Sequence, residues 1–135
     1  MATRLKRCNA RTDLYLGNIG DEAARFEETI VRGKAYRAAG ADCVYPISLR
    51  DPRTIERLVE ALDRTPINVN VRAGSPSVTE LEALGVARAS TASQMAVMTM
   101  GRMRRIAEEL RRIGRFDALD PEIAQAEAQQ LFAPG

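Results

Sequence analysis

The sequence has the length and composition of one ordinary globular domain. It has 135 residues, of which 45% are hydrophobic and 28% charged, and a chain of this size can bury a single core. Its 20 basic and 18 acidic residues give a net charge of +2, so bulk charge does not favour a nucleic-acid partner. No apolar run has the length of an export signal or approaches the roughly 20 residues of a membrane span. We therefore expect a cytoplasmic protein with neither a nucleic-acid nor a membrane partner.

The histidine and cysteine content limits the kinds of catalysis and metal binding that the chain can support. The chain has no histidine, which excludes histidine-activated nucleophiles and histidine-ligated zinc. Its two cysteines, Cys8 and Cys43, lie in short apolar or strand-like stretches, where free thiols are commoner than disulfides or metal ligands. We expect Cys8 to be packed in the core and to have no catalytic role, because nothing near it in the sequence would lower its pKa.

Short apolar runs alternate with longer helical patterns along the chain, which is typical of βα units with parallel strands. The predicted strands cover residues 5–10, 41–46, 67–71 and 86–90. The predicted helices cover residues 21–39, 52–62, 77–84, 92–113 and 121–132.

Helix-capping residues support these boundaries. Asp21 and Asp51 are suited to accept hydrogen bonds from the first turns of their helices. Ser77 and Glu80 have the spacing of a capping box. Asp120, followed by a proline, predicts the start of the last helix.

Four segments of the sequence resemble the phosphoenolpyruvate mutase branch of the isocitrate lyase superfamily. They are NARTD at 9–13, AGADCVYP at 39–46, NV followed by AGSPSVTEL within 68–81, and LGVARAS at 84–90. Their order and spacing match the fifth to eighth strands of that family's barrel. The resemblance implies an α/β fold in which residues 1–135 form one partial domain, the C-terminal half of a (β/α)8 TIM barrel. That half has four parallel βα units and a further C-terminal helix, whereas a complete barrel needs about 250 residues.

The resemblance also implies a chemistry. Known members are Mg2+-dependent enzymes that make or break C–C or C–P bonds of 2-oxo or 2-hydroxy acids through an enolate, and their metal carboxylates lie in the first half of the barrel. For this chain alone we therefore expect no catalytic residue, metal ligand or cofactor, and a small 2-oxo or phosphonate acid as ligand if it is active. The alternative is a truncated, catalytically inactive homologue that acts only through association.

Three residues are predicted to bind the substrate because they match positions of the family. Arg11 matches an arginine that holds a carboxylate or phosphonyl group, a task suited to a rigid guanidinium. Asn68 matches an asparagine of the seventh strand, and Ser90 on the last strand faces the same barrel mouth. Thr12 and Asp13 are candidate supports of Arg11. The structural alternative is an ion pair of Arg11 with Asp13 or Asp42.

Three other patterns have structural explanations beside functional ones. The turn at residues 74–77 could hold an anion, but most such turns only cap a helix. The arginines at 102–112 alternate with acids and indicate a solvated helix face. The stripe of Met95, Met98 and Met103 with Val97 and Ile106 favours core packing or a subunit contact. Because a half barrel also exposes strand edges, we expect a homo-oligomer.

Overall fold

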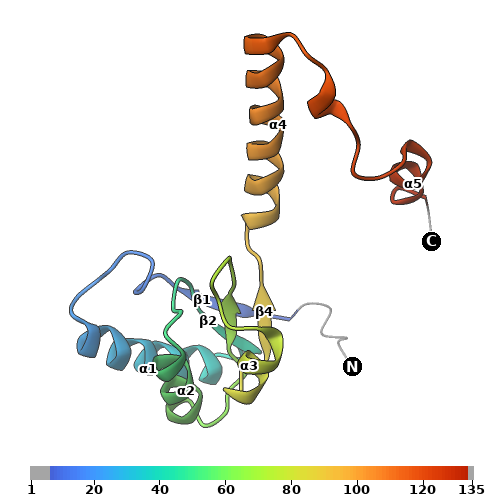
Figure 1. Cartoon of the computed structure of the whole chain (residues 1–135). Helices are drawn as coiled ribbons and strands as arrows, with labels where there is room; N and C mark the ends of the chain where they lie inside the picture. Colours follow the sequence, from blue (N-terminus) through green and yellow to red (C-terminus); the bar gives the residue numbers. More distant parts are fainter. Residues whose placement is uncertain (1–6, 134–135) are drawn as a thin grey trace. The chain divides into compact units, whose positions relative to one another are not determined.

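The computed structural model describes residues 7–133, and the chain divides into two compact units, residues 1–92 and 93–135. We describe each unit by itself. Figure 1 shows the strands in the first unit and the long helix α4 in the second. The organisation of the whole chain as one domain stays a prediction.

The first unit alternates strands and helices, as the sequence predicts. The order is β1 (Asn9–Thr12), α1 (Glu22–Ala38), β2 (Cys43–Pro46), α2 (Pro52–Ala61), β3 (Asn68–Asn70), α3 (Val78–Ala83) and β4 (Arg88–Ser90). The α/β class with parallel strands is thereby confirmed. The first strand includes residues 11 and 12, beyond the predicted range of 5–10, and residues 5 and 6 lie outside the described part of the chain.

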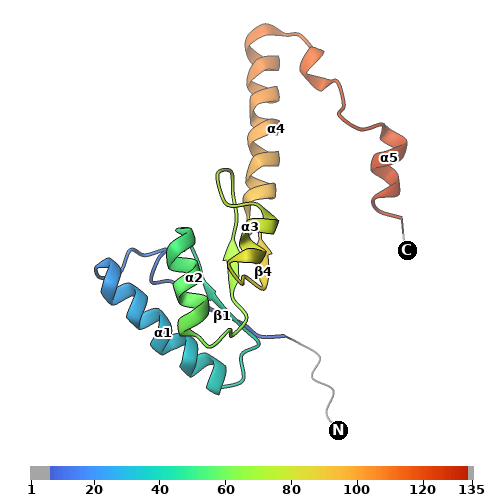
Figure 2. The same ribbon diagram turned by 60° about the horizontal axis from the view of Figure 1, so that its bottom comes forward.

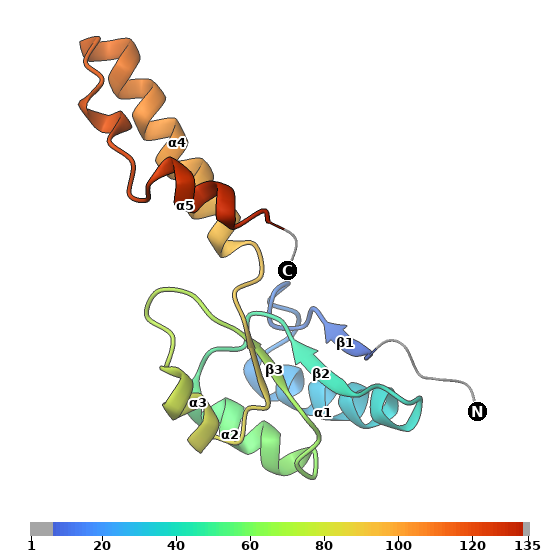
Figure 3. The same cartoon turned by 90° about the vertical axis from the view of Figure 1, so that its right-hand side faces the viewer.

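The strands pair in parallel. β1 pairs with β2 and β3 pairs with β4, and a single parallel bridge between Val44 and Ile67 links β2 to β3. Helices α1 and α2 lie side by side in Figure 2. Figure 3 shows the helices of this unit gathered on one side of the strands.

The core lies between these helices and the strands. Ile55 and Leu58 of α2 are fully buried together with Val44 of β2, and Phe26 of α1 packs in the same cluster. Burying such a side chain stabilises the fold by about 1.5–3 kcal/mol, so this cluster supplies much of the stability of the first unit.

The predicted helix caps are present. The Asp21 carboxylate accepts a hydrogen bond from the N–H of Ala24 at 2.8 Å, and Asp51 accepts one from the N–H of Thr54 at 2.8 Å. Ser77 and Glu80 form the complete capping box. Each cap satisfies backbone donors that the first turn of a helix leaves unpaired.

The second unit is helical. It contains α4 (Gln94–Ile113), the short 3-10 helix η1 (Asp117–Leu119) and α5 (Gln125–Gln130). The prediction of one helix over 121–132 capped by Asp120 is wrong, because α5 starts later and Asp120 instead ends η1. The described residues of α5 bury no side chain, and a helix without a packed face is marginal at this length.

Cys8 is exposed, so the prediction that it packs in the core is wrong. It lies immediately before β1, where few side chains cover it. Cys43 is half-buried, and both cysteines are free thiols, as predicted. Among the described residues, no helix combines the length and apolarity needed to cross a membrane.

Candidate functional site

The strands of the first unit have one apolar face and one polar face. Val44, Ile67 and Val69 belong to the core that packs on the helices. Because successive side chains of a strand point to opposite faces, the residues between them point away from the helices. The strand residues of this opposite face are Asn9, Arg11, Cys43, Tyr45, Asn68, Asn70, Arg88 and Ser90.

The register places these polar residues in rows. Arg11 pairs with Tyr45, Asn68 pairs with Arg88, and the bridge between β2 and β3 puts Tyr45 beside Asn68. One row therefore runs Arg11, Tyr45, Asn68, Arg88. Ser90 lies two residues beyond Arg88 and belongs to the next row, nearer the carboxyl ends of the strands. All three predicted binding residues thus share one face, although no hydrogen bond joins them within the described residues.

Arg11 is held by Asp13. Its Nε lies 2.5 Å from Oδ1 of Asp13 and its Nη2 lies 3.0 Å from Oδ2, a two-point pairing that fixes the plane of the guanidinium. The hydrogen bond to Arg11 lowers the pKa of Asp13, and the same bond raises the pKa of Arg11. Arg11 is therefore a permanent cation with a fixed orientation, and both side chains are about half exposed.

Of the residues predicted to contact Arg11, the structure pairs only one with it. Asp13 is its partner, whereas Asp42 accepts a hydrogen bond from the N–H of Cys8 at 2.7 Å. Thr12 is 2% exposed and lies on the helix side of β1, since it follows Arg11 in the strand. Its hydroxyl has no hydrogen-bond partner in the described structure, and we assign it no role in positioning Arg11.

Asn68 is buried without hydrogen bonds. The residue is 1% exposed, yet neither its amide oxygen nor its amide nitrogen has a partner among the described residues. A buried polar group without a partner costs about 1–3 kcal/mol, and such groups are rare. Asn68 therefore has one donor group and one acceptor unsatisfied, and a ligand would reach them only if the surrounding side chains moved.

Sequence reasoning did not find the role of Asn70. Its Oδ1 accepts a hydrogen bond from the N–H of Ser48 at 2.8 Å. Ser48 has a left-handed backbone with φ of 73°, which costs a non-glycine residue about 1–2 kcal/mol. Asn70 is thus a structural brace for the turn after β2. Tyr45 and Arg88 were also missed, although strand alternation combined with the register would have placed them on the site face.

A hollow of about 510 Å³ opens at the amino ends of the strands, away from Ser90. Asn9, Cys43 and Arg88 line it together with Asp42. Burial raises the pKa of the Cys43 thiol, so this group is neutral at physiological pH and is a poor nucleophile. The hollow therefore adds polar lining to the site face, and the exposed free thiol of Cys8 lines it too.

The side chains of the described residues do not form a binding site for the Mg2+ that enzymes of the similar family use. No group of three or more Asp, Glu, Cys or His side chains is placed to hold a metal within residues 7–133. Mg2+ is bound through carboxylate oxygens, and the one carboxylate beside Arg11 is already paired with it. We assign no metal-dependent step to these residues.

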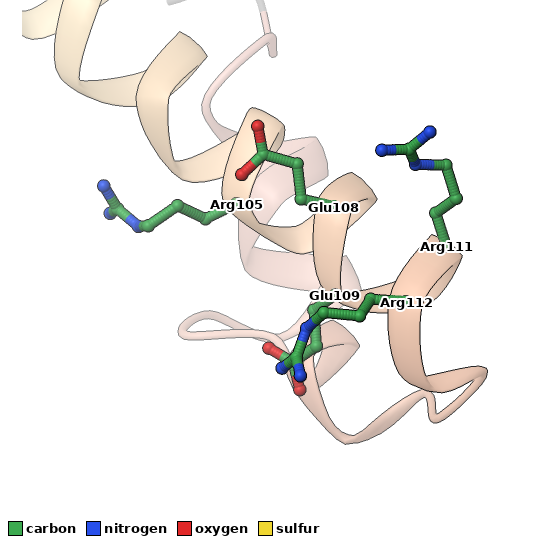
Figure 4. A pocket seen from close by; sticks show the side chains of 5 residues that line it. All are labelled: Arg105, Glu108, Glu109, Arg111 and Arg112. Atoms are coloured by element: carbon green, nitrogen blue, oxygen red, sulfur yellow. The ribbon is translucent and has the colours of Figure 1, made fainter.

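Two other features do not form ligand sites. The Ser77 N–H and hydroxyl both donate to the carboxylate of Glu80 at 2.7 Å, so the turn at 74–77 caps its helix. An open hollow on α4 is lined by five charged side chains, which project from the helix in Figure 4. Arg104 pairs with Glu108 at 3.7 Å along the same helix, as expected for a solvated face.

Comparison with known proteins identifies the family. The model of the phosphoenolpyruvate phosphomutase family matches residues 6–111. A structure from Burkholderia cenocepacia J2315 described as a lyase/mutase is 34% identical, with a TM-score of 0.81 over 93% of this chain and 44% of its own. A structure from the same organism described as a phosphonomutase is 33% identical, with a TM-score of 0.67 over 76% of this chain and 42% of its own.

An oxaloacetate acetylhydrolase in complex with its product oxalate is 25% identical, with a TM-score of 0.73 over 93% of this chain and 42% of its own. A search of the curated proteins found no match. The chain therefore belongs to the phosphoenolpyruvate phosphomutase family, within the isocitrate lyase superfamily. It spans less than half the length of these solved relatives.

Proposed function

We propose that this chain supplies the acid-binding strands of a lyase or phosphonomutase that acts on a 2-oxo or 2-hydroxy acid. In this proposal its four βα units are the C-terminal half of a (β/α)8 barrel, and the acid binds on the polar strand face. The observation that carries the proposal is the fixed guanidinium of Arg11 on that face. The solved relatives support it, since they are described as a lyase/mutase and a phosphonomutase.

Arg11 has a free edge suited to a carboxylate. A guanidinium carries five N–H donors, and Asp13 takes the side that carries Nε and Nη2. The remaining edge, formed by Nη1 and Nη2, presents two parallel N–H groups. Such a pair matches the two oxygens of a carboxylate or phosphonyl group.

Asn68 and Ser90 complete the binding set. The unpaired amide of Asn68 can donate to the 2-oxo oxygen or accept from a 2-hydroxy group, which would satisfy a group now buried without a partner. Ser90 can donate its hydroxyl hydrogen to a second carboxylate. These residues bind and orient the acid, and the groups that break its bonds would come from outside the described residues.

The proposal predicts saturable binding of oxalate to the whole chain through Arg11, measured as amide shifts in heteronuclear NMR. Arg11→Ala should weaken binding by roughly tenfold or more, because a charge-assisted pair is lost. Arg53→Ala is the matched control, since Arg53 is exposed on α2. Equal oxalate affinity of the wild type and Arg11→Ala would contradict the proposal, as would an equal loss in the control.

The second candidate is an inactive homologue that acts only through association. Within the described residues, the open edges of β1 and β4 favour it, because unpaired strand edges invite association. It predicts a defined assembly in solution in which oxalate produces no saturable shift, even when binding is followed into the millimolar range. The NMR titration therefore separates the two candidates.

We further propose that the chain works as a homo-oligomer. Within the described residues, β1 pairs only with β2, and β4 pairs only with β3. One edge of each of these strands therefore presents unpaired backbone groups, which soluble proteins normally cover. A second copy of this chain is always present and could cover these edges.

A further inference from the structure

Strand β1 turns some of its backbone groups toward an open edge. The carbonyl oxygens of Cys8 and Thr12 accept hydrogen bonds from N–H groups on the β2 side, at 3.1 and 3.3 Å. In a parallel pair, every second residue of a strand bonds to the neighbouring strand. The N–H and C=O groups of Asn9 and Arg11 therefore face away from β2, toward the edge that no described strand covers.

Strand β4 has the same arrangement at the other end of the strand order. The N–H of Arg88 donates to the carbonyl oxygen of Ile67 at 3.1 Å. The carbonyl oxygen of Ser90 accepts from the N–H of Val71 at 2.8 Å. The N–H and C=O of Ala89, between these two residues, therefore face away from β3. A second open edge results, and it too has no partner strand among the described residues.

The two open edges are suited to each other in direction. All the strand pairings of the first unit are parallel, so β1 and β4 run the same way. A half-turn about an axis along the strands brings the β1 of a second copy beside the β4 of the first, again in parallel, and its β4 beside the first copy's β1. Because the helices lie on one side of the strands (Figure 3), the helices of both copies then lie outside.

Two copies also supply the number of strands that closes. A (β/α)8 barrel consists of eight parallel strands with its helices outside, and each copy provides four. The aligned 93% of this chain covers 44% of the lyase/mutase relative, so two copies have about the length of one relative. A contact between unlike edges grows into fibres if it does not close, whereas this contact closes at two copies.

A hollow of about 290 Å³ beside β4 leaves room for an added strand. Its apolar lining consists of Val78, Leu81, Val86, Ala87 and Ala89. Val78 is 74% exposed, so the described structure leaves this lining open. The helix-side residues of β1, Ala10 and Thr12, are uncharged. A β1 strand added at this edge would therefore cover the hollow without setting a charge against it.

We propose that two copies of this chain close into one eight-stranded barrel, in which β1 of each copy pairs in parallel with β4 of the other. The polar strand face becomes the inner face of this ring, so the strands of the second copy complete the wall around each acid site. This inference rests on the proposed homo-oligomer, and it does not depend on which acid binds.

The first test measures amide hydrogen exchange of the whole chain, labelled at several protein concentrations and read by NMR. The N–H groups of Asn9, Arg11 and Ala89 should exchange roughly tenfold or more slowly in the dimer than after dilution. The N–H of Arg88, which is bonded to Ile67 within one copy, is the control and should be protected at every concentration. Fast exchange of the three edge amides in a sample that light scattering shows to be oligomeric overturns the ring and leaves the homo-oligomer standing.

The second test removes one edge donor at a time. Asn9→Pro and Ala89→Pro each delete an N–H that faces an open edge, where proline is tolerated because no bond within the copy is lost. In sedimentation equilibrium each variant alone should weaken the dimer by roughly tenfold or more, since both contacts of the ring are damaged. Circular dichroism checks that the helices are kept.

An equal mixture of the two variants is the matched control. In a mixed dimer one contact joins the two altered strands and the other joins the two unaltered strands. The mixture should therefore associate more tightly than either variant alone. Pairing between like edges predicts instead that one of the variants keeps wild-type affinity. That result, or a mixture no tighter than its components, overturns the proposed ring.

Discussion

At the scale of single residues, the site depends on one fixed cation and one unsatisfied amide. Asp13 holds the guanidinium of Arg11 at two points, and this arrangement presents a defined edge to an anion. Asn68 carries the cost of burial without hydrogen bonds. Functional sites often retain such a cost because a ligand can relieve it.

One glycine, directly after helix α3, packs closely against helix α2. Gly85 has a left-handed backbone with φ of 81°, and a Cβ added there would lie 2.9 Å from Cγ1 of Val59. Gly85→Ala should therefore combine backbone strain with overpacking and destabilise the protein by about 2–4 kcal/mol. Urea denaturation measures the loss.

The control is Gly40→Ala, which has φ of 95° but no atom within 4 Å of the added Cβ. It should show the backbone strain alone, about 1–2 kcal/mol. Equal losses in the two variants would mean that the contact between Gly85 and Val59 is too loose to matter.

Residue-level prediction from sequence was uneven for physical reasons. Arg11, Asn68 and Ser90 were predicted because they match positions of the family, and strand alternation places them on one face of the strands. The burial of a side chain was not predictable from the sequence pattern: Cys8 lies in a short apolar stretch of the sequence but is exposed in the structure, beside β1. The unpartnered amide of Asn68 was not predictable either, since it depends on the neighbouring strands.

At the scale of elements, the capping residues determine where the helices begin. Asp51 accepts hydrogen bonds from both the N–H and the hydroxyl of Thr54 at the start of α2. Replacing such a cap by alanine typically costs about 1 kcal/mol. We expect Asp51→Ala to lower the free energy of unfolding by that amount at neutral pH, and Glu56→Ala, exposed on the same helix, to have a smaller effect.

The Asp51 contribution should depend on pH. The hydrogen bonds from Thr54 lower the pKa of Asp51 below its ordinary value of 3.8. Its stabilising contribution is therefore complete above that value and is lost as the pH falls through the lowered pKa. Denaturation at several pH values should show the wild type and Asp51→Ala converging in acid. A constant difference between them would contradict this account.

Elements with caps and a packed face were predicted well, and elements without them were not. Asp21, Asp51 and Ser77 mark their helices correctly. Asp120 looks equivalent in sequence, but the segment after it packs on no core, and α5 is short. The stripe of methionines on α4 buries no residue within the described structure, so its prediction as a core face is not borne out there, and a subunit contact stays a prediction.

At the scale of the whole molecule, the two units differ in how they are stabilised. All of the buried apolar side chains of the described residues lie between Leu14 and Leu81, within the first unit. The second unit buries none in α4. The family relatives are more than twice as long as the aligned part of this chain. Association is therefore central to the account, because it would cover the open edges of β1 and β4.

The most direct measurement is the mass of the purified whole chain by light scattering over a range of concentrations. The account predicts a single species whose mass is an even multiple of 14.8 kDa. A stable monomer at all concentrations would contradict the account, since the unpaired edges of β1 and β4 would then be tolerated in water.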